Sequence, residues 1–416
     1  MRLAGKASNS KDLKIINRIS VLNIIRKNAP VARHEVAKMT GLTPAAVTVI
    51  VNELIETGVI REVGHGESSG GRRPVMLEVN ASTGYIFVAR IQQGEIVTAL
   101  LDLAGNILEN QKQKIETTRS EEIVATIGRV FDTVIVKFRI PREKVLWCGV
   151  ASPGLVNSYI GTVERSANLN WRQVNFAEML SQRLSGVPVN VENISNAAAL
   201  GEKFYGSGYG CANLIYLNLS VGIGAGIIIN HELFSGVRGY AGEIDLIAVS
   251  TFSDDQNTSK VQCHKFKELC GVGAIIKKVK AIIPVATFSQ MGLSKNQIGI
   301  EEILLPPLIE LPEVRMIILE ASRLIGIKVA ELINLFNTEM VVLGGELTWA
   351  GDLLLDSVIN MVKEHTYPEM TESVKILITS MKEDPPLMGV YALVYEKLFN
   401  SGKLICSAIP FISHNK

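Results

Sequence analysis

Two arginines behind a pair of glycines are the side chains of this sequence best suited to bind a polyanion. Arg72 and Arg73 follow that pair in a loop over Gly64–Pro74. The glycines free the backbone to follow a ligand surface, and guanidinium groups bind phosphate or enter a narrow minor groove of DNA. A basic glycine loop is also typical of a solvated linker, so the flanking elements must decide between the two interpretations.

The elements around this loop follow the pattern of a winged helix-turn-helix domain. Thr43 before Pro44 marks a helix start, because the hydroxyl caps the first turn and proline suits the first helical position. Gly41 gives a tight turn just before it. Helices, turn, strand, loop and return strand come in the order that such domains require. The predicted elements are helices over Arg18–Arg26, Arg33–Thr40 and Pro44–Thr57 and a strand over Val75–Val79.

Residues 1–80 are therefore predicted to bind duplex DNA. A recognition helix contacts base edges mainly through its N-terminal residues, and small apolar groups suit thymine methyls. With few hydrogen-bonding groups on that helix, we expect specificity to depend on the wing and on DNA shape. The candidate DNA contacts are Arg33, Thr43, Ala45, Ala46, Thr48, Arg72 and Arg73. The expected core of the domain is Ile19, Leu22, Ile25, Val36, Ala37, Met39, Val47, Ile50, Val51 and Leu54.

Charge and composition agree with this division. The chain has 416 residues and a net charge of +1, yet residues 1–80 carry twelve Lys and Arg against seven Asp and Glu. The length predicts two or three domains, and a hydrophobic content of 47% is enough to build their cores. No apolar run is long enough to span a bilayer and no signal peptide opens the sequence, so we expect a cytoplasmic protein. Five scattered cysteines fit reduced thiols better than a disulfide framework.

From Gly84 onward, short apolar strands alternate with helices, which predicts an α/β fold. The glycines of Gly222–Gly226 let the backbone approach a phosphate or a sugar, although tight strand packing explains them equally well. The polar segment Ser250–Cys270 is predicted to be an elaborated loop. The expected helices are Ser120–Lys137, Asn175–Leu184, Asn196–Phe204, Pro312–Asn334 and Leu353–His365. The expected strands are Tyr85–Ile91, Ile96–Asp102, Val145–Ala151, Val187–Val191, Leu214–Ser220, Gly224–Asn230 and Met340–Leu343.

Several motifs in this part resemble the ROK family of sugar kinases and sugar-responsive repressors. They are CGVASPGLVNSYIGTVERSANLNW (Cys148–Trp171), VENISNAAALGE (Val191–Glu202), GIGAGIIINHELFSG (Gly222–Gly236), AGEIDLIAV (Ala241–Val249) and LINLFNTEMVVLGGEL (Leu332–Leu347). The GGRRP wing (Gly70–Pro74) resembles the repressor branch. The resemblance implies a two-lobed, actin-like and ribonuclease H-like domain, in dimers or tetramers. We expect a DNA-binding domain over 1–80, a first lobe over 81–195 joined by a C-terminal helix over 385–416, and a second lobe over 196–384 on the dimerisation and effector side.

The resemblance also implies which residues bind an effector and which chemistry is lost. Family positions that hold sugar hydroxyls match Asn168, Asn193 and Glu243, and the neighbouring motifs add Gly154 and Gly224 as effector-binding candidates. The family's catalytic aspartate is replaced by Ile194, which cannot accept a proton. At the place of the kinase Asp-x-Gly-Gly-Thr phosphate loop stands Ala89-Arg90-Ile91-Gln92-Gln93. We therefore expect no enzyme activity and no cofactor.

The family's zinc site is altered as well. Leu246 replaces the histidine ligand, and only Cys263 and Cys270 remain nearby, so an improvised site with His264 and Asp245 or His231 is the alternative to no metal. The effector pocket is open to three interpretations: a sugar site, a pocket kept only for folding, or one retuned by Lys265 or Lys267 for an acidic ligand. The predicted function is a DNA-binding regulator, most simply a repressor, of carbohydrate-related genes. The alternatives are a sugar kinase with an added DNA module and a regulator controlled by a protein partner.

Overall fold

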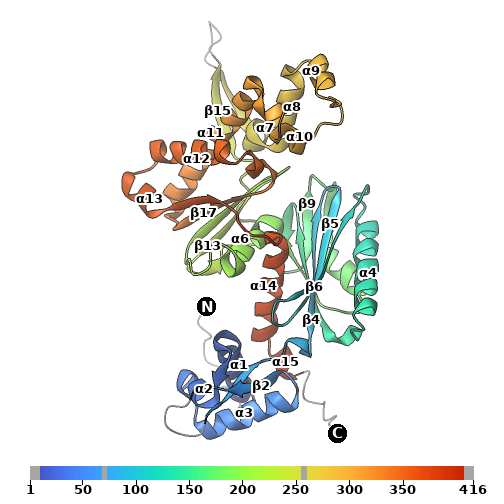
Figure 1. Cartoon of the computed structure of the whole chain (residues 1–416), viewed down its shortest axis with the longest axis vertical. Coiled ribbons are helices and arrows are strands. Elements are labelled where there is room, and N and C mark those ends of the chain that lie inside the picture. Colours follow the sequence, from blue (N-terminus) through green and yellow to red (C-terminus); the bar gives the residue numbers. More distant parts are fainter. Residues whose placement is uncertain (1–9, 68–72, 254–259, 407–416) are drawn as a thin grey trace.

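The computed structural model describes residues 10–67, 73–253 and 260–406, and its first domain is a winged helix-turn-helix at one end of the molecule (Figure 1). The second helix has the predicted bounds and the third ends one residue earlier, whereas the first begins well before Arg18. The three strands form an antiparallel sheet in the order β1-β3-β2. The elements are α1 Ser10–Asn28, β1 Val31–Ala32, α2 Arg33–Thr40, α3 Pro44–Glu56, β2 Ile60–His65 and β3 Val75–Val79.

The local signals act as predicted, with one error in the core. The Thr43 side chain accepts a hydrogen bond from the Ala46 backbone N–H at 3.3 Å and caps α3, and Gly41 has the left-handed φ of 70°. Met39, expected in the core, is 51% exposed. It lies about 200° around α2 from the buried Ala37, since each helical residue adds about 100°. Met39 was therefore wrongly placed.

A five-stranded sheet in the order β11-β7-β4-β5-β6 forms the first lobe of the larger part. The three strands β4, β5 and β6 are antiparallel, whereas β7 and β11 are parallel to β4 and to each other. Helices α4 and α5 pack on one face through a shared apolar core. The bounds are β4 Tyr85–Gln92, β5 Glu95–Asp102, β6 Ile107–Lys114, α4 Ser120–Lys137, β7 Val145–Ser152, α5 Phe176–Arg183 and β11 Val189–Asn193.

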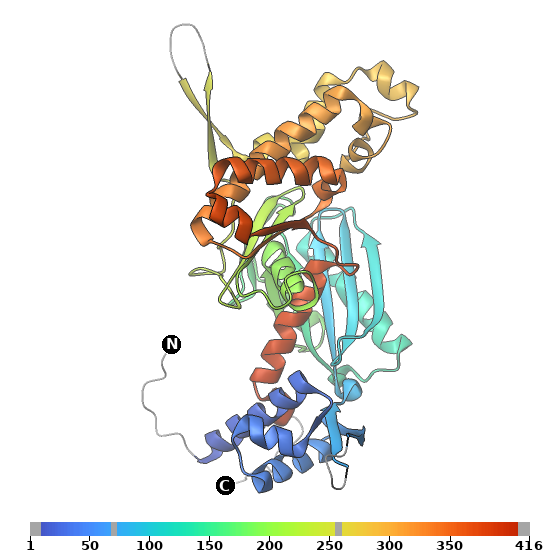
Figure 2. The same ribbon diagram turned by 60° about the vertical axis from the view of Figure 1, so that its left-hand side comes forward.

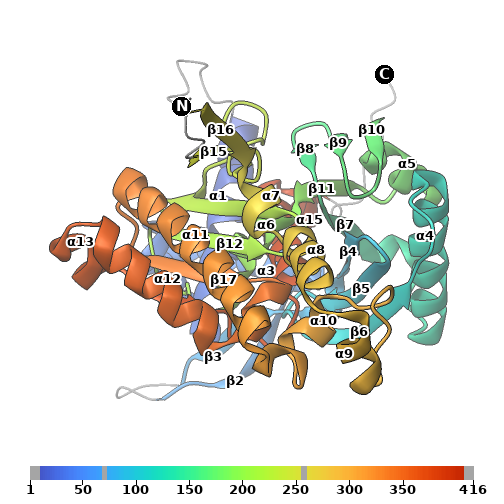
Figure 3. The same cartoon turned by 90° about the horizontal axis from the view of Figure 1, so that it is seen from above.

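A second five-stranded sheet, β14-β13-β12-β17-β18, forms the other lobe. Its strands β12, β17 and β18 are parallel, and β13 is antiparallel to β12. Figure 3 shows α11 and α12 side by side along this lobe. Two related sheets with helices on their faces give the expected two-lobed α/β architecture. The bounds are β12 Leu214–Leu219, β13 Ile223–Ile229, β14 Glu232–Leu233, α11 Pro312–Phe336, β17 Met340–Gly344, α12 Asp352–His365 and β18 Lys375–Ile378.

Two helices, α6 (Ile194–Tyr205) and α14 (Pro385–Asn400), connect the lobes. Helix α6 packs on β12 and β13, and α14 packs on β4 and β7 as well as on α6. Their crossing is unusually close, because a Cβ atom on Gly389 would overlap the carbonyl oxygen of Ala197. A side chain on either helix at this crossing would push the two helices apart. Because their backbones are in contact there, a shift of one helix displaces the other. Figure 2 shows α14 continuing from the lobes toward the DNA-binding domain.

Several parts of the fold differ from the sequence prediction. The polar strand β6 was not predicted, because its outer edge position leaves few buried residues. The stretch over Ser250–Cys270 is a β-hairpin and a short helix, whereas a loop was predicted; β15 and β16 pair antiparallel outside the residues 254–259. The expected C-terminal helix is interrupted after Asn400. Further elements are β8 Leu155–Asn157, β9 Thr162–Ser166, β10 Trp171–Val174, β15 Ala248–Ser253, β16 Lys260–Lys265, α7 Phe266–Cys270, α8 Val272–Ile282, α9 Val285–Gln290, α10 Ile300–Leu304, α13 Pro368–Ser373 and α15 Lys403–Cys406.

Among the described helices, none combines the length and apolarity that crossing a membrane requires.

Candidate functional site

A cleft of about 710 Å³ opens between the two lobes. Its walls come from the β4–β5 turn, the segment after β7, the start of α6, the β12–β13 turn and the segment after β14. Such a concave site with a few converging polar groups is the usual form of a small-molecule site. All five predicted effector residues line it, namely Gly154, Asn168, Asn193, Gly224 and Glu243.

Asn193 is the residue through which the cleft is joined to α6. Its side-chain oxygen accepts hydrogen bonds from the backbone N–H groups of Ser195 at 2.7 Å and Asn196 at 3.3 Å, and so caps the helix. Its amide nitrogen donates to the Gly154 carbonyl at 2.9 Å and to Glu243 Oε1 at 3.3 Å. One side chain thus fixes the helix start, the loop after β7 and a carboxylate from the opposite lobe.

Glu243 reaches the cleft because a glycine precedes it. Gly242 has a φ of 88°, and a Cβ there would overlap the Ala225 carbonyl, so only glycine lets this segment approach β13. Burial, and to a smaller extent the Asp245 carboxylate, raises the pKa of Glu243 to about 7, against an opposing effect of Lys267. Its carboxyl is consequently able to donate or accept hydrogen bonds near neutral pH.

The glycines of the cleft have two roles. Gly154, with a φ of 107°, would overlap the Arg165 carbonyl if it carried a side chain. A Cβ on Gly224 would lie 2.5 Å from Ser195 Oγ, so this glycine lets β13 pack on α6 as well as lining the cleft. The packing explanation that the sequence left open therefore applies at Gly224, and its approach to a ligand stays a prediction.

One rim of the cleft is basic. Lys265, Lys267 and Arg165 line it, and Lys267 is held at 2.7 Å by Asp245. Lys265 is exposed and lies 3.8 Å from the exposed Glu268, and screening by water makes that pair weak. An acidic group on a ligand would meet at most two cations that are not closely paired.

The β4–β5 end of the cleft is arranged quite differently. Arg90 is buried and donates to Asp384 at 2.6 Å, to Glu95 at 2.7 Å and to Gln92. Gln92 in turn donates a hydrogen bond to Glu346 at 2.6 Å. This bond joins the first lobe to the second. The second Glu346 oxygen is buried and has no hydrogen-bond partner among the described residues. This end is closed by the chain's own side chains and carries an excess of carboxylates.

Comparison with known proteins identifies the family to which this chain belongs. The model of the ROK family matches residues 90–397. The chain belongs to the ROK family. A winged helix-turn-helix DNA-binding model also matches residues 16–61, in agreement with the described first domain.

Relatives of similar length are ROK repressors. The chain is 29% identical over 398 residues to the xylose repressor of Caldicellulosiruptor bescii, covering 93% of this chain and 97% of that one. A ROK family transcriptional regulator, a homologue of the E. coli MLC protein, superposes with a TM-score of 0.78 at 25% identity over 95% of this chain and 99% of that one. A ROK glucokinase from Streptomyces griseus, solved with glucose and AMPPNP, gives 0.60 at 25% identity, with 74% and 99% coverage.

Two stretches that the sequence analysis compared with the ROK kinase site lie at the cleft. Ile194 lines it directly after Asn193. The stretch Ala89–Gln93 contributes the Arg90 and Gln92 contacts described above and contains no glycine. Their correspondence to the kinase base and phosphate loop stays a prediction from the resemblance.

The candidate metal ligands are dispersed. Cys270 is buried and its thiol donates to the Phe266 carbonyl at 3.3 Å, whereas Cys263 is exposed on β16. Asp245 is paired with Lys267, and His231 lies 3.4 Å from the Lys203 ammonium. Within the described ranges, no three His, Cys, Asp or Glu side chains are grouped to hold a metal ion.

The DNA-facing candidates are mostly exposed. Thr43, Ala45 and Thr48 are exposed on the first turns of α3, and Ala46 is half-buried. The Thr48 hydroxyl donates to the Pro44 carbonyl at 2.8 Å, and the Thr43 hydroxyl is engaged in the cap. The hydroxyls thus have partners within α3, which leaves mainly methyl groups for base edges.

The basic candidates differ in their surroundings. Arg33 makes an ion pair with Glu62 at 3.0 Å, so it contacts the base of the wing within its own domain. Arg73 is exposed next to Pro74. Arg72 lies outside the described residues and stays a prediction.

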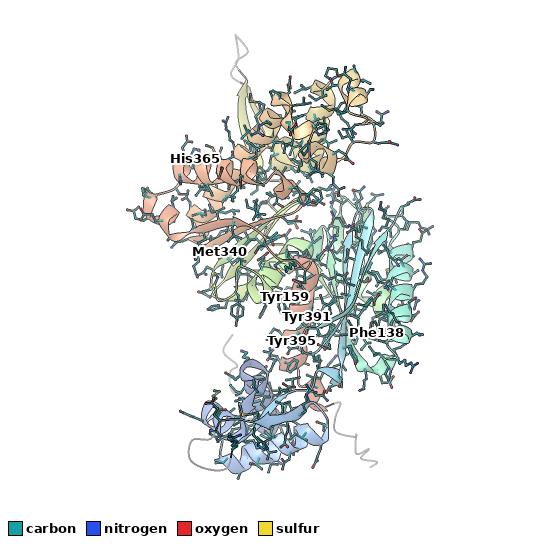
Figure 4. All side chains as sticks on the ribbon, viewed as in Figure 1. Phe138, Tyr159, Met340, His365, Tyr391 and Tyr395 are labelled. Atoms are coloured by element: carbon teal, nitrogen blue, oxygen red, sulfur yellow. The ribbon has the colours of Figure 1, made fainter. Side chains whose placement is uncertain are left out.

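A contact between the DNA-binding domain and α14 was not predicted from the sequence. Arg26 on α1 binds both oxygens of Glu396, at 2.8 and 3.1 Å, and its guanidinium lies over the rings of Tyr395 and Phe399. Figure 4 shows Tyr395 on α14 on the side nearer the DNA-binding domain and Tyr391 farther along the same helix. The apolar core of the first domain is continuous with Leu398 of α14 and Leu404 of α15.

Proposed function

We propose that the protein is a cytoplasmic DNA-binding repressor of carbohydrate-related genes, which binds operator DNA as a dimer and senses a monosaccharide in its interlobe cleft. The observation that carries this proposal is the coexistence of an open polar cleft end with a closed nucleotide end in one chain that also has a winged helix-turn-helix domain. A sensor needs the first end alone, whereas a kinase needs both.

The cleft supports a polyhydroxylated ligand. Asn168, Asn193 and Glu243 present amide and carboxyl groups from three separate segments, and hydroxyl groups hydrogen-bond with both kinds. Relatives named xylose repressors make D-xylose the first sugar to test. The basic rim extends the panel to phosphorylated and acidic sugars.

A mechanical connection supports control of DNA binding. Asn193 caps α6, α6 packs backbone to backbone on α14 through Gly389, and α14 holds α1 through Arg26 and Glu396. A ligand that draws Glu243 toward Asn193 would shift the start of α6 and, through α14, the DNA-binding domain. Two states with different affinity for the sugar and for DNA give reciprocal control.

Phosphoryl transfer is disfavoured by the same geometry. No carboxylate stands at Ile194 to take the proton of a sugar hydroxyl, which general base catalysis requires. Glu346, Glu95 and Asp384 surround the place where phosphates would need cations and backbone N–H groups. An ATP-coupled assay over hexoses, pentoses and N-acetylhexosamines tests the kinase alternative, and steady turnover above the ATP-only rate would establish it.

Selection of binding sites from random duplex DNA tests the proposed function. We expect a pseudo-palindromic site with half-sites a whole number of helical turns apart, and affinity that falls steeply with salt. Ala46→Trp should abolish binding to that site because the indole blocks entry of α3 into the groove, and Arg73→Ala should weaken it. Ala248→Trp and Arg172→Ala, on exposed positions of the lobes, are the matched controls. No enriched site, or full affinity of Ala46→Trp, would refute DNA recognition by α3.

A partner protein in place of a sugar is the remaining alternative. A thermal-shift panel separates the two, since a bound sugar raises the melting temperature in proportion to the logarithm of its concentration. Silence across the whole panel would favour the partner.

A further inference from the structure

Exposed cations from both lobes line the interlobe cleft in addition to the candidate sugar-binding residues. Arg165 on β9 comes from the first lobe, and Lys265 at the end of β16 comes from the second. Figure 3 shows β9 and β16 on the same side of the molecule. An anionic group on a ligand in the cleft would therefore meet a positive charge from each lobe.

The strand pairing turns Arg165 toward the cleft next to another arginine. In the antiparallel sheet β10-β9-β8, Arg165 lies directly opposite Arg172 on one side and Leu155 on the other. Residues directly opposite each other project from the same face of a sheet. Because both Leu155 and Arg165 line the cleft, this face is turned toward it. Arg172 thus adds a second positive charge beside Arg165.

The two arginines are placed unfavourably as long as no anion is bound. Like charges directly opposite each other on neighbouring strands destabilise a sheet. Both side chains are exposed, and neither makes an ion pair or a side-chain hydrogen bond to any residue in the described ranges. Two other arginines of the same lobe, Arg142 and Arg183, are neutralised by Asp132 at 2.6 and 2.7 Å. The pair at the cleft is therefore available to a negatively charged ligand.

The two lysines of the second lobe differ in how firmly they are held. Lys267 is fixed by Asp245 at 2.7 Å. Lys265 lies 3.8 Å from Glu268, and both of these side chains are more than half exposed, so that water screens the pair. An anionic ligand can replace Glu268 at this lysine with little loss. Lys265 is therefore the cation of the second lobe that we assign to a ligand.

A buried hydroxyl beside Arg165 also lacks a partner. Ser166 lines the cleft and is 1% exposed, and its Oγ has no hydrogen-bond partner among the described residues. A buried hydroxyl without a partner costs free energy, and an oxygen of a bound ligand would supply the missing hydrogen bond. The Ser166 hydroxyl, the guanidinium and the ammonium together offer the donors that carboxylate and phosphate oxygens require.

We propose that the cleft binds an anionic monosaccharide, with its ring against Asn168, Asn193 and Glu243 and its carboxylate or phosphate between Arg165 and Lys265. The proposal rests on the sugar-sensing role proposed above and names the chemical class of the ligand. Without a ligand, the positive charges of the two lobes repel each other across the cleft. A bound anion replaces this repulsion by attraction to both cations, so the charged group itself helps to close the lobes on each other.

Calorimetric titration of the full-length protein with a matched series of sugars tests the proposal. As pyranoses, D-xylose, D-glucose, D-glucuronate and D-glucose 6-phosphate share their ring hydroxyls and differ in the group on ring carbon 5, and D-glucose 1-phosphate places the charge on the other side of the ring. At least one anionic sugar should bind about 30-fold or more tightly than D-glucose, as expected for charge-assisted contacts. Added potassium chloride should reduce this preference, because salt screens exposed charges. The anion that binds more tightly identifies the bound group as carboxylate or phosphate.

Substitutions at the two cations separate this subsite from the ring site. Arg165→Gln and Lys265→Gln should each lower the ratio of anionic to neutral sugar affinity by about tenfold, since each removes one charge-assisted contact. Both side chains are exposed, and an unchanged melting temperature establishes that the variants are folded. Lys277→Gln, at an exposed position of α8 outside the cleft, is the matched control and should keep the full preference.

Two results would overturn the proposal and leave sugar sensing intact. One is equal affinity for the neutral and anionic sugars, and the other is a preference that persists when both Arg165 and Lys265 are replaced by glutamine. Absence of binding by every sugar of the series would overturn the proposal together with the sugar-sensing part of the proposed function. Recognition of operator DNA is measured without sugar and would stand or fall separately.

Discussion

The two ends of the interlobe cleft differ in how far their polar side chains are already bound within the chain. At the effector end, Asn193 is bound by α6, Gly154 and Glu243, whereas Glu243 has only its 3.3 Å contact with Asn193 among the hydrogen bonds of the described residues. At the nucleotide end, Arg90 is bound by three partners and Gln92 reaches across to Glu346. Polar groups left partly unused can bind a ligand, whereas groups that satisfy one another cannot. The difference supports the proposal that the cleft senses a sugar.

The comparison also shows how the closed β4–β5 end contributes to the stability of the fold. Breaking a buried ion pair by removing one partner costs about 3 to 5 kcal/mol, because a charge is left without compensation. The Arg90 contacts join β4 to the residue that caps α14, and the Gln92 contact joins β4 to the segment after β17. The β4–β5 end thus supports the helix that leads to the DNA-binding domain.

Of the substitutions proposed here, the removal of Arg90 should weaken this support the most. Arg90→Ala leaves Asp384 and Glu95 without their buried cation, and we expect the free energy of unfolding to fall by about 3 kcal/mol in urea titrations. Arg142→Ala, which removes a half-exposed pair with Asp132, should cost less than about 1 kcal/mol. A loss below 1 kcal/mol in Arg90→Ala would mean that the closed end has no structural importance.

The open end can be broken without disturbing its helix. Asn193→Asp keeps an oxygen that caps α6 but loses the amide that donates to Gly154 and Glu243. We expect sugar affinity to fall by about 100-fold, as for a lost hydrogen bond next to a newly unpaired polar group, and the melting temperature to fall as well, because the new carboxylate faces the Gly154 carbonyl and the Glu243 carboxyl. Asn193→Ala should lose the cap as well and cost about 1 kcal/mol of stability. Calorimetric titration measures the first effect, and equal sugar binding by Asn193→Asp and wild type would contradict the assignment.

A change of pH should have a smaller effect on sugar affinity. Because the pKa of Glu243 is raised to about 7, its carboxyl is protonated below that value in the folded protein and becomes charged as the pH rises through it. A charged acceptor binds sugar hydroxyls more strongly, so sugar affinity should increase by about tenfold between pH 6 and pH 8. Glu243→Gln should flatten this profile. The same pH dependence in Glu243→Gln would assign the titration to another group.

Local sequence signals were enough to predict most helices and strands. They did not predict the side-chain contacts that join these elements. The Thr43-Pro44 start, the Gly41 turn and the apolar strands predicted their elements within a few residues, because capping and periodicity are encoded nearby. The hairpin around residues 248–265 was missed, since its polar strands leave the lobe and lack an alternating apolar face. The Arg90–Asp384 and Arg26–Glu396 pairs join residues about 300 positions apart or more, and no local pattern marks either.

The candidate effector residues were predicted from motif resemblance, and this prediction also missed a connection between elements. Motif resemblance brought Asn168, Asn193 and Glu243 to one cleft, because family positions carry tertiary information that spacing alone does not. It did not reveal that Asn193 also caps α6, which connects the sugar site to the helix that reaches the DNA-binding domain. That double role appears only when the cleft and the helix are seen together.

The most direct test of the account is fluorescence anisotropy of the selected operator DNA, titrated with protein in the absence and presence of saturating sugar. We predict that the sugar weakens DNA binding by about tenfold or more in the wild type, as expected for a coupling of 1 to 3 kcal/mol. Asn193→Asp should bind the operator as the wild type does without sugar and should not respond to it. Unchanged operator affinity with a sugar that calorimetry shows to be bound would contradict the coupling of cleft and DNA-binding domain.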